Sequence, residues 1–150
     1  MLTLGDIAPI VALNDQHGSV VDWSRLRGRR VMVFFYPKAS TPGCTQQACA
    51  LRDVAAQIGD TQIIGVSPDK PATQLKFAEK YSLPFPLLAD VDHVLSEAYG
   101  VWKQKQLYGR TYMGIERSAF LLDEKGKVMH AWYKISPKDT PVKLLEALGE

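Results

Sequence analysis

The chain lacks the features that mark membrane or nucleic-acid-binding proteins. No stretch approaches the roughly 20 apolar residues of a membrane span. The start, 1-MLTLGDIAPIVAL-13, has neither the basic nor the long apolar region of a signal peptide. With 18 basic and 16 acidic residues the net charge is only +2, which gives no strongly basic surface. We therefore expect a cytoplasmic protein with no membrane or nucleic-acid partner.

Cysteine is scarce, because Cys44 and Cys49 are the only two in the 150 residues. A chain of this length that is 46% hydrophobic can bury a core without disulfide staples, so we expect a single domain over residues 1–150. The cytosol keeps thiols reduced. The two cysteines are therefore candidates for inert packing, metal binding or catalysis rather than for a structural disulfide.

Motifs for metal, phosphate and common hydrolase sites are missing as well. The three histidines, His17, His93 and His130, are scattered without ligand spacing, and two thiolates need two further ligands to hold a structural zinc. The chain contains no C-x-x-C, no G-x-S-x-G, no H-E-x-x-H and no glycine-rich phosphate loop. We expect no metal site.

What the sequence does contain is an alternation of strand-like and helix-like segments. Strands are expected at 30–36, 61–67, 86–89, 118–123 and 127–132, and helices at 44–58, 71–81, 93–99 and 139–148. The turn 14-NDQHGS-19 predicts a short hairpin, and Asp92 is the expected N-cap of the third helix. This order predicts an α/β fold, a thioredoxin-like three-layer sandwich with a mixed central sheet, an N-terminal hairpin and an inserted strand–helix segment.

Cys44 occupies an unusual position for an inert cysteine. It follows a buried strand and the turn Pro42–Gly43, so it falls in the first turn of a helix at the carboxyl end of a central strand. Free N–H groups and the positive end of the helix dipole favour an anion there. The thiolate is the reactive form of cysteine. The position indicates a reactive thiol, although packing as a small hydrophobic residue remains an alternative.

Cys49 lies five positions after Cys44 on the same expected helix. In an unbroken helix that spacing gives a rise of about 7.5 Å and places the two Cα atoms about 8.6 Å apart. A disulfide needs less than about 7 Å. If the two cysteines pair, at least the first helical turn must unwind, so the spacing suits a switch better than a staple.

The segment 36-YPKASTPGCTQQACALRD-53 resembles the peroxiredoxins, and within them the bacterioferritin-comigratory-protein/PrxQ subfamily. The family motif P-x-x-x-[TS]-x-x-C is met by Pro37, Thr41 and Cys44. The distant arginine of the family matches Arg117 in 114-GIERSAFLLDEKGKV-128. Similar segments extend over essentially the whole chain. Gln47 departs from the pattern, since many members carry glutamate at that position.

This resemblance implies an antioxidant thiol peroxidase without a cofactor. Cys44 would be the peroxidatic cysteine, which takes an oxygen from hydrogen peroxide or an organic hydroperoxide and becomes a sulfenic acid. Cys49 would be the resolving cysteine, which forms an intramolecular disulfide with it. A dithiol partner, thioredoxin by resemblance, would reduce the disulfide, and the subfamily implies a monomer.

The motif residues surround the expected nucleophile, and each also has a simpler reading. The backbone N–H groups of Gly43 and Cys44, the Thr41 hydroxyl and the Arg117 guanidinium are expected to bind the peroxide oxygens. Pro37 is expected to shield the thiolate from water. The alternatives are that Thr41 only caps the helix, that Pro37 only ends the strand, and that Arg117 is a solvated surface residue.

Two further residues are expected to position the site without contacting the peroxide. Gln47 would help to position the helix and its arginine neighbours, and Arg52 would pair with Asp53 or another nearby acid. Two other functions remain open, a general disulfide oxidoreductase and a non-enzymatic redox sensor or holdase. The missing C-x-x-C and the presence of Thr41 with Arg117 argue against the former.

Overall fold

The computed structural model describes residues 1–149. The strands are β1 (Val31–Phe35), β2 (Gln62–Ser67), β3 (Leu87–Ala89), β4 (Trp102–Leu107), β5 (Arg110–Ile115), β6 (Ser118–Leu122) and β7 (Val128–Trp132). The helices are α1 (Pro42–Val54), α2 (Pro71–Tyr81), α3 (Val94–Ala98) and α4 (Asp139–Leu148), with 3₁₀ turns η1 (Trp23–Leu26) and η2 (Ala55–Gln57).

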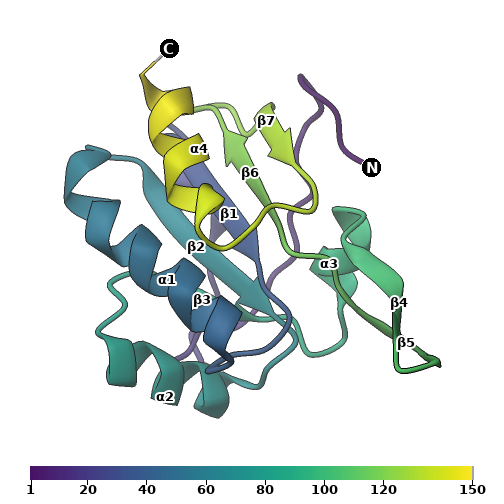
Figure 1. Ribbon diagram of the computed structural model, residues 1–150. Coiled ribbons are helices and arrows are strands. Elements are labelled where there is room, and N and C mark those ends of the chain that lie inside the picture. The colour runs from purple at the N-terminus through teal and green to yellow at the C-terminus, as the bar shows by residue number, and fades with distance from the viewer. Residues whose placement is uncertain (150) are drawn as a thin grey trace.

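A five-stranded mixed sheet forms the centre, in the order β3-β2-β1-β6-β7 (Figure 1). Strand β1 is parallel to β2 and antiparallel to β6, and β6 is antiparallel to β7. The expected thioredoxin-like α/β architecture with a mixed sheet is therefore confirmed. The continuous apolar run of the β1 segment follows from this place, because a strand in the middle of a covered sheet is buried on both faces.

Two hydrophobic clusters lie on opposite faces of the sheet. Along β1, Met32 and Phe34 belong to one cluster and Val33 and Phe35 to the other, all with no exposed surface. Helices α1, α2 and α4 supply the first cluster, and the N-terminal segment with η1 and α3 supplies the second. This arrangement confirms the expected three layers.

The expected helix over residues 44–58 is shorter in the structure. Helix α1 ends at Val54, and the N–H of Ala55 bonds to the carbonyl of Arg52, three residues back. This tighter bonding begins the 3₁₀ turn η2, a common way to end a helix. Helices α2 and α4 match their expected ranges.

The expected N-terminal hairpin is present in a short form. An antiparallel bridge joins Asn14 to Val20 around a turn held by the Asp15 carboxylate. The N–H of Val21 also bonds to the Leu13 carbonyl at 3.0 Å, and the N–H of Asp15 bonds to the Ser19 carbonyl at 2.9 Å. The flanking backbone finds other partners, because Asn14 accepts from the N–H of Ala89 beyond it and Ile7 forms a bridge with Lys127. The N-terminal segment is thus held both by its own turn and by two parts of the core.

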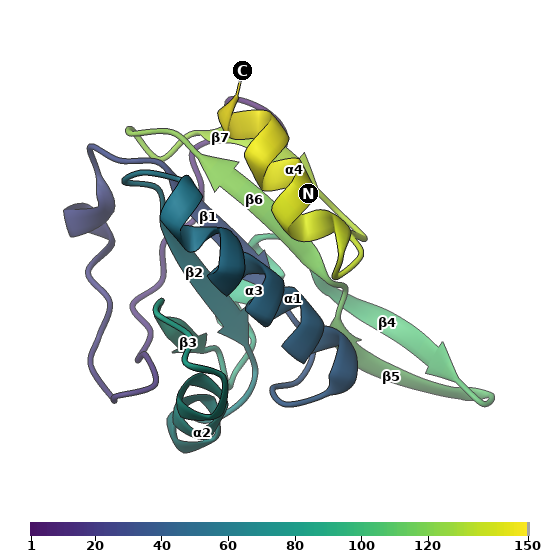
Figure 2. The same ribbon diagram turned by 60° about the vertical axis from the view of Figure 1, so that its left-hand side comes forward.

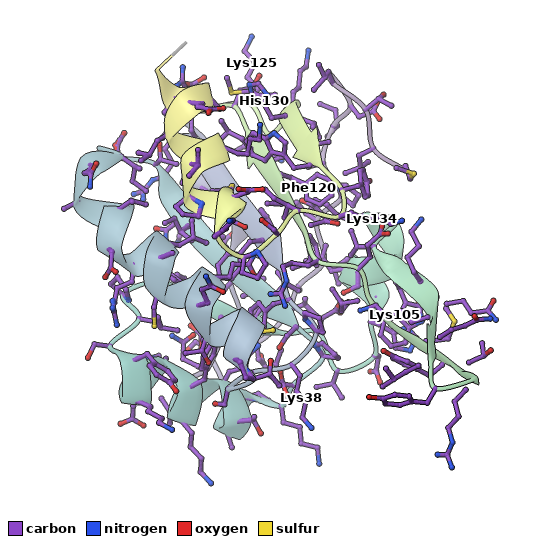
Figure 3. All side chains as sticks on the ribbon, in the orientation of Figure 1. Lys38, Lys105, Phe120, Lys125, His130 and Lys134 are labelled. Atoms are coloured by element: carbon purple, nitrogen blue, oxygen red, sulfur yellow. The ribbon has the colours of Figure 1, made fainter. Side chains whose placement is uncertain are left out.

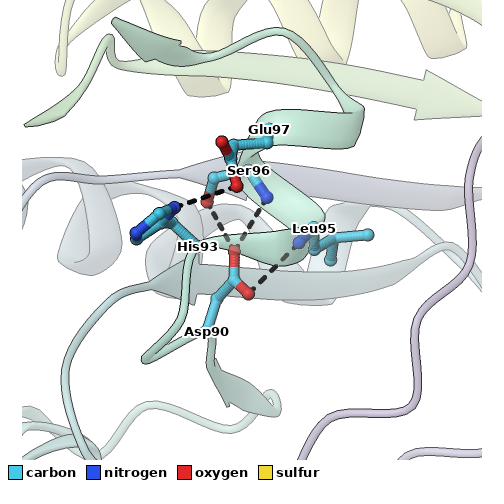
Figure 4. A network of polar contacts seen from close by, with 5 residues as sticks. All are labelled: Asp90, His93, Leu95, Ser96 and Glu97. Carbon is cyan, nitrogen blue, oxygen red and sulfur yellow. Dashed lines mark hydrogen bonds and ion pairs between the residues drawn. The ribbon is translucent and has the colours of Figure 1, made fainter. Parts of the chain in front are cut away.

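The expected cap of α3 by Asp92 is wrong. Asp90, directly after β3, is fully buried, and its carboxylate accepts from the N–H groups of Leu95 and Ser96 at 3.2 and 2.8 Å (Figure 4). The backbone N-cap position falls on His93, in the left-handed region at φ 49°. The exposed Asp92 lies outside this arrangement because the chain turns sharply between the two aspartates.

The hairpin β4–β5 was not expected. Its turn residues Tyr108 and Gly109 both have positive φ, at 51° and 76°, as a two-residue type I′ hairpin requires. Figure 2 shows the hairpin projecting from the body of the molecule. The sequence signal was the Tyr–Gly pair between two alternating stretches, which contain too few apolar residues to look like buried strands.

Two features are absent from the described residues, 1–149. No helix among them is long and apolar enough to cross a bilayer. No three His, Cys, Asp or Glu side chains among them gather closely enough to hold a metal ion.

Candidate active site

Cys44 lies in the first turn of α1, as expected. Thr41 is the N-cap, Pro42 is the first helical residue, and the N–H of Thr45 bonds to the Thr41 carbonyl at 2.9 Å. The N–H groups of Gly43 and Cys44 precede this bond, so the helix provides no acceptor for them. Cys44 is only 1% exposed. A sheltered sulfur thus lies beside two backbone donors and the positive end of a helix.

Arg117 joins this site from a distant part of the sequence. Its Nη1 lies 3.5 Å from the sulfur of Cys44 and donates at 2.8 Å to the side-chain oxygen of Gln47. The arginine reaches the site because it immediately precedes Ser118, which is paired with Phe35 at the end of β1. The simpler reading of Arg117 as a solvated surface residue is wrong.

Gly43 allows the guanidinium to approach the helix. A Cβ atom at this position would lie 3.1 Å from Nη2 of Arg117 and 3.6 Å from Cγ of Pro137. The first distance is tighter than almost all real Cβ contacts. The sequence suggested Gly43 only as a backbone donor, and its lack of a side chain is a second reason for glycine here.

Gln47 is fully buried and connects α1 to α4. Its oxygen accepts from Arg117, and its Nε2 donates at 3.0 Å to the hydroxyl of Thr140. Thr140 in turn donates to the carbonyl of Ser136 at 2.9 Å. Since that hydroxyl proton is used, Thr140 needs a donor from position 47, which an amide supplies and an ionised carboxylate does not. Sequence reasoning missed Thr140 and Ser136, which carry no motif.

Thr41 and Pro37 flank the nucleophile in the loop between β1 and α1. The Thr41 hydroxyl donates to the Lys38 carbonyl at 2.7 Å and makes no bond to the helix N–H groups. Thr41 therefore caps the helix by position but not through its side chain, and its oxygen keeps lone pairs for another donor. Pro37 is half-buried directly after the buried Tyr36.

A buried polar network behind the site fixes this loop. Tyr36 donates to Gln74, which donates to Ser67 at 2.8 Å, and Ser67 donates to Asp69 at 2.7 Å. The same Asp69 oxygen accepts from the N–H of Ala39 at 2.7 Å. Burial raises the pKa of Tyr36 well above its usual range, so the phenol stays a neutral donor. The loop that precedes Cys44 is thus tied to β2 and α2.

Cys49 is half-buried on the same continuous helix as Cys44, and both thiols are free. The two cysteines therefore lie on one helix, as expected, and are not bonded to each other. Arg52 bonds to Asp53, as expected, and donates to the Tyr81 carbonyl at 2.7 Å. The bond to Asp53 raises the pKa of Arg52, burial opposes the rise, and Cys49 adds to it. Arg52 therefore lies beside Cys49 and away from the group around Arg117.

Comparison with known proteins agrees with this geometry. The AhpC/TSA family model matches residues 4–131. Peroxiredoxin Bcp of Bacillus subtilis is 44% identical over 151 residues, covering 99% of this chain and 96% of the relative. Peroxiredoxin Bcp of Escherichia coli is 48% identical over 133 residues, covering 87% of this chain and 85% of the relative.

Solved structures give the same result. The bacterioferritin comigratory protein of Xanthomonas campestris, studied for its alkyl peroxide reduction, superposes with a TM-score of 0.89 at 33% identity, covering 99% of this chain and 96% of that one. A cysteine mutant of PrxQ from Xylella fastidiosa gives a TM-score of 0.92 at 26% identity, covering 99% and 96%.

A buried cysteine at a helix start, approached by an arginine on a thioredoxin-like sheet, defines a thiol peroxidase, and this chain is an oxidoreductase of that class. It belongs to the AhpC/TSA family and, within it, to the Bcp/PrxQ peroxiredoxins.

Proposed function

We propose that Cys44 reduces hydrogen peroxide and organic hydroperoxides through a sulfenic acid. The thiolate attacks the terminal oxygen, an S–O bond forms, and the O–O bond breaks. The hydroxyl group stays on sulfur, and the leaving oxide takes a proton to become water or an alcohol. The observation that carries the proposal is the Arg117 guanidinium 3.5 Å from the Cys44 sulfur at a helix N-terminus.

Transition-state stabilisation must supply most of the rate. Complete ionisation of an ordinary cysteine at pH 7 would increase the thiolate fraction only about 30-fold, whereas enzymes typically accelerate reactions by about a million-fold or more. Charge moves from sulfur to the peroxide oxygens during the attack. The N–H groups of Gly43 and Cys44 and the Arg117 guanidinium would stabilise that charge. The Thr41 oxygen would accept a hydrogen bond from the O–H of the peroxide and so orient it.

Cys49 then resolves the intermediate in our proposal. Its sulfur attacks the sulfenic acid, a Cys44–Cys49 disulfide forms, and water leaves. An intact helix holds the two Cα atoms about 8.6 Å apart, so part of α1 must unwind first. A dithiol protein, thioredoxin in our proposal, returns two electrons and two protons and restores both thiols.

Replacement of each cysteine by serine tests the two steps. Cys44→Ser should abolish peroxide consumption in a thioredoxin-coupled assay. Cys49→Ser should form one sulfenic acid per chain, detected by mass after dimedone labelling, and then stop under thioredoxin. Full activity of Cys44→Ser would refute the proposal, and full thioredoxin turnover by Cys49→Ser would show that another group resolves the intermediate.

We also propose that the protein works as a monomer in the cytoplasm. Both reacting cysteines come from one chain, so the cycle needs no second copy. Light scattering of the reduced and oxidised protein would test the monomer, and a dimer in both states would contradict it.

A further inference from the structure

A cavity of about 530 Å³ opens beside the candidate active site. Arg117 belongs to its lining together with Lys103, Lys105 and Lys134, and Glu116 is the one acidic residue among the lining residues. Four cations and one carboxylate leave a net charge of +3. The Glu116 carboxylate lies 3.9 Å from the Lys134 ammonium, so it offsets one of these cations only.

The side chain of Lys105 extends toward Arg117. Its aliphatic stem crosses Gly114, where a Cβ atom would lie 3.5 Å from Lys105 Cδ and 3.8 Å from Cε. Lys105 is paired with Tyr112, so the stem runs along β5 toward the end of the strand that leads to Arg117. Figure 3 shows Lys105 on the β4–β5 hairpin and Lys134 on the segment after β7. The hairpin and the loop after β7 thus form two sides of one cavity.

Lys105 lies within the electrostatic field of the site. Burial, followed by the charge of Arg117, lowers the pKa of Lys105, while Cys44 and Glu116 act in the opposite direction. Two neighbouring cations in a half-buried cavity repel each other. An anion bound between them would reduce this repulsion.

The cavity also has apolar walls. Tyr112 of the hairpin and the buried Ile135 line it beside the cations. Hydrogen peroxide is neutral and too small to contact these walls and Arg117 at once. Cationic heads next to apolar walls match an organic molecule that carries an acid group.

We propose that this basic pocket, formed by Lys103, Lys105, Lys134, Tyr112 and Ile135, binds the carboxylate and hydrocarbon part of an organic hydroperoxide whose peroxide group is reduced at Cys44. The inference rests on the proposed peroxidase function and names a substrate class for it. The chemistry at sulfur is unchanged, and the alcohol product keeps the carboxylate.

Two substrates that differ only in charge test the pocket. A tertiary-alkyl hydroperoxide with a carboxylate and its methyl ester are compared by kcat/KM, and the ratio of the two cancels any change in sulfur reactivity. The wild type should prefer the carboxylate by about tenfold, the scale of electrostatic attraction into a charged cleft. In Lys103→Gln/Lys105→Gln the ratio should fall close to one. Raising the salt concentration should reduce the wild-type ratio.

Lys125→Gln is the matched control, because it removes a cation from the exposed turn between β6 and β7 and should keep the wild-type ratio (Figure 3). A wild-type ratio near one, or an unchanged ratio in the double variant, would overturn the basic pocket while leaving hydrogen peroxide reduction intact. A wild type that reduces no peroxide at all would overturn the proposed function and the pocket with it.

Discussion

The two cysteines of α1 lie in very different surroundings although only one and a half turns separate them. Cys44 is 1% exposed and lies beside Arg117, whereas Cys49 is half-buried and lies beside Arg52. The surroundings of Cys44 hold the charged Arg117 guanidinium in a fixed position beside the sulfur. The surroundings of Cys49 are less enclosed and restrain its thiol less.

The partners of the two turns differ as well. The turn of Cys44 is bound to β6 and α4 through Arg117, Gln47 and Thr140, in contacts that are largely buried. The turn of Cys49 is bound to α2 through Arg52, whose side chain is 34% exposed. Buried charge-assisted bonds hold more strongly than exposed ion pairs. We therefore expect the Cys49 turn, more than the first helical turn that the spacing alone suggested, to unwind and carry its sulfur to Cys44.

Loss of the guanidinium should have the largest effect on this contrast. Arg117→Ala should slow the attack of hydrogen peroxide on Cys44 by about 100-fold or more, as removal of a transition-state donor does in other enzymes. Stopped-flow tryptophan fluorescence measures the rate. If Arg117 acts only on thiolate formation, a higher pH will restore the rate, and that recovery would contradict the role in the transition state.

Gly43→Ala is the companion variant, because it keeps the arginine and displaces it. Its Cβ would meet Nη2 at 3.1 Å, so the guanidinium must shift away from the helix. We expect the attack of hydrogen peroxide on Cys44 to slow, by less than in Arg117→Ala. An unchanged rate would mean that the position of the guanidinium over Gly43 is unimportant.

A charge at position 47 should have the next largest effect. In Gln47→Glu the carboxylate neutralises Arg117 and no longer donates to Thr140, so the attack on peroxide should slow by about tenfold, the scale of one charge-assisted hydrogen bond. Thr140→Val is the matched control, because it breaks the same contact without adding charge. It should lower the free energy of unfolding by about 1–2 kcal/mol and slow the attack less. Equal rates for the two variants would show that charge at position 47 does not matter.

The smallest effect is expected at the Cys49 turn. Arg52→Ala removes the bond to the Tyr81 carbonyl and should accelerate disulfide formation by about two- to threefold, because a single, partly buried bond restrains the turn only weakly. The attack phase should stay unchanged. The second phase of the stopped-flow trace reports the step. Slower disulfide formation would mean that Arg52 assists the Cys49 thiol instead of restraining the helix.

Local pattern made the central elements predictable. The apolar run ending at Phe35 predicts a buried strand, and the Pro42–Gly43 turn predicts the helix start before Cys44. Both predictions depend on only a few neighbouring residues. The sequence pointed to Asp92 because it lies directly before the third helix, and only the tertiary structure shows that the Asp90 carboxylate is the one buried below the helix. The β4–β5 hairpin was missed because its strands are mostly exposed and lack an apolar face.

The residues of the candidate site also divide into those that the sequence could predict and those that depend on the tertiary structure. Pro37, Thr41, Cys44 and Arg117 could be named from their resemblance to a family motif. The close approach of Arg117 to Gly43 and the bond from Gln47 to Thr140 could not be predicted, because each joins residues more than 70 positions apart. Such contacts depend on how α1, β6 and α4 pack together, which local sequence does not determine.

The bond between Gln47 and Thr140 also sets an order of events during synthesis. The nucleophile and its helix are made in the first third of the chain, and Arg117 follows much later. The hydroxyl that holds Gln47 in place belongs to α4, 93 positions after Gln47. A growing chain therefore carries its reactive cysteine long before the group that orients it is complete. We expect peroxidase activity to arise only when α4 has been synthesised and packed against α1.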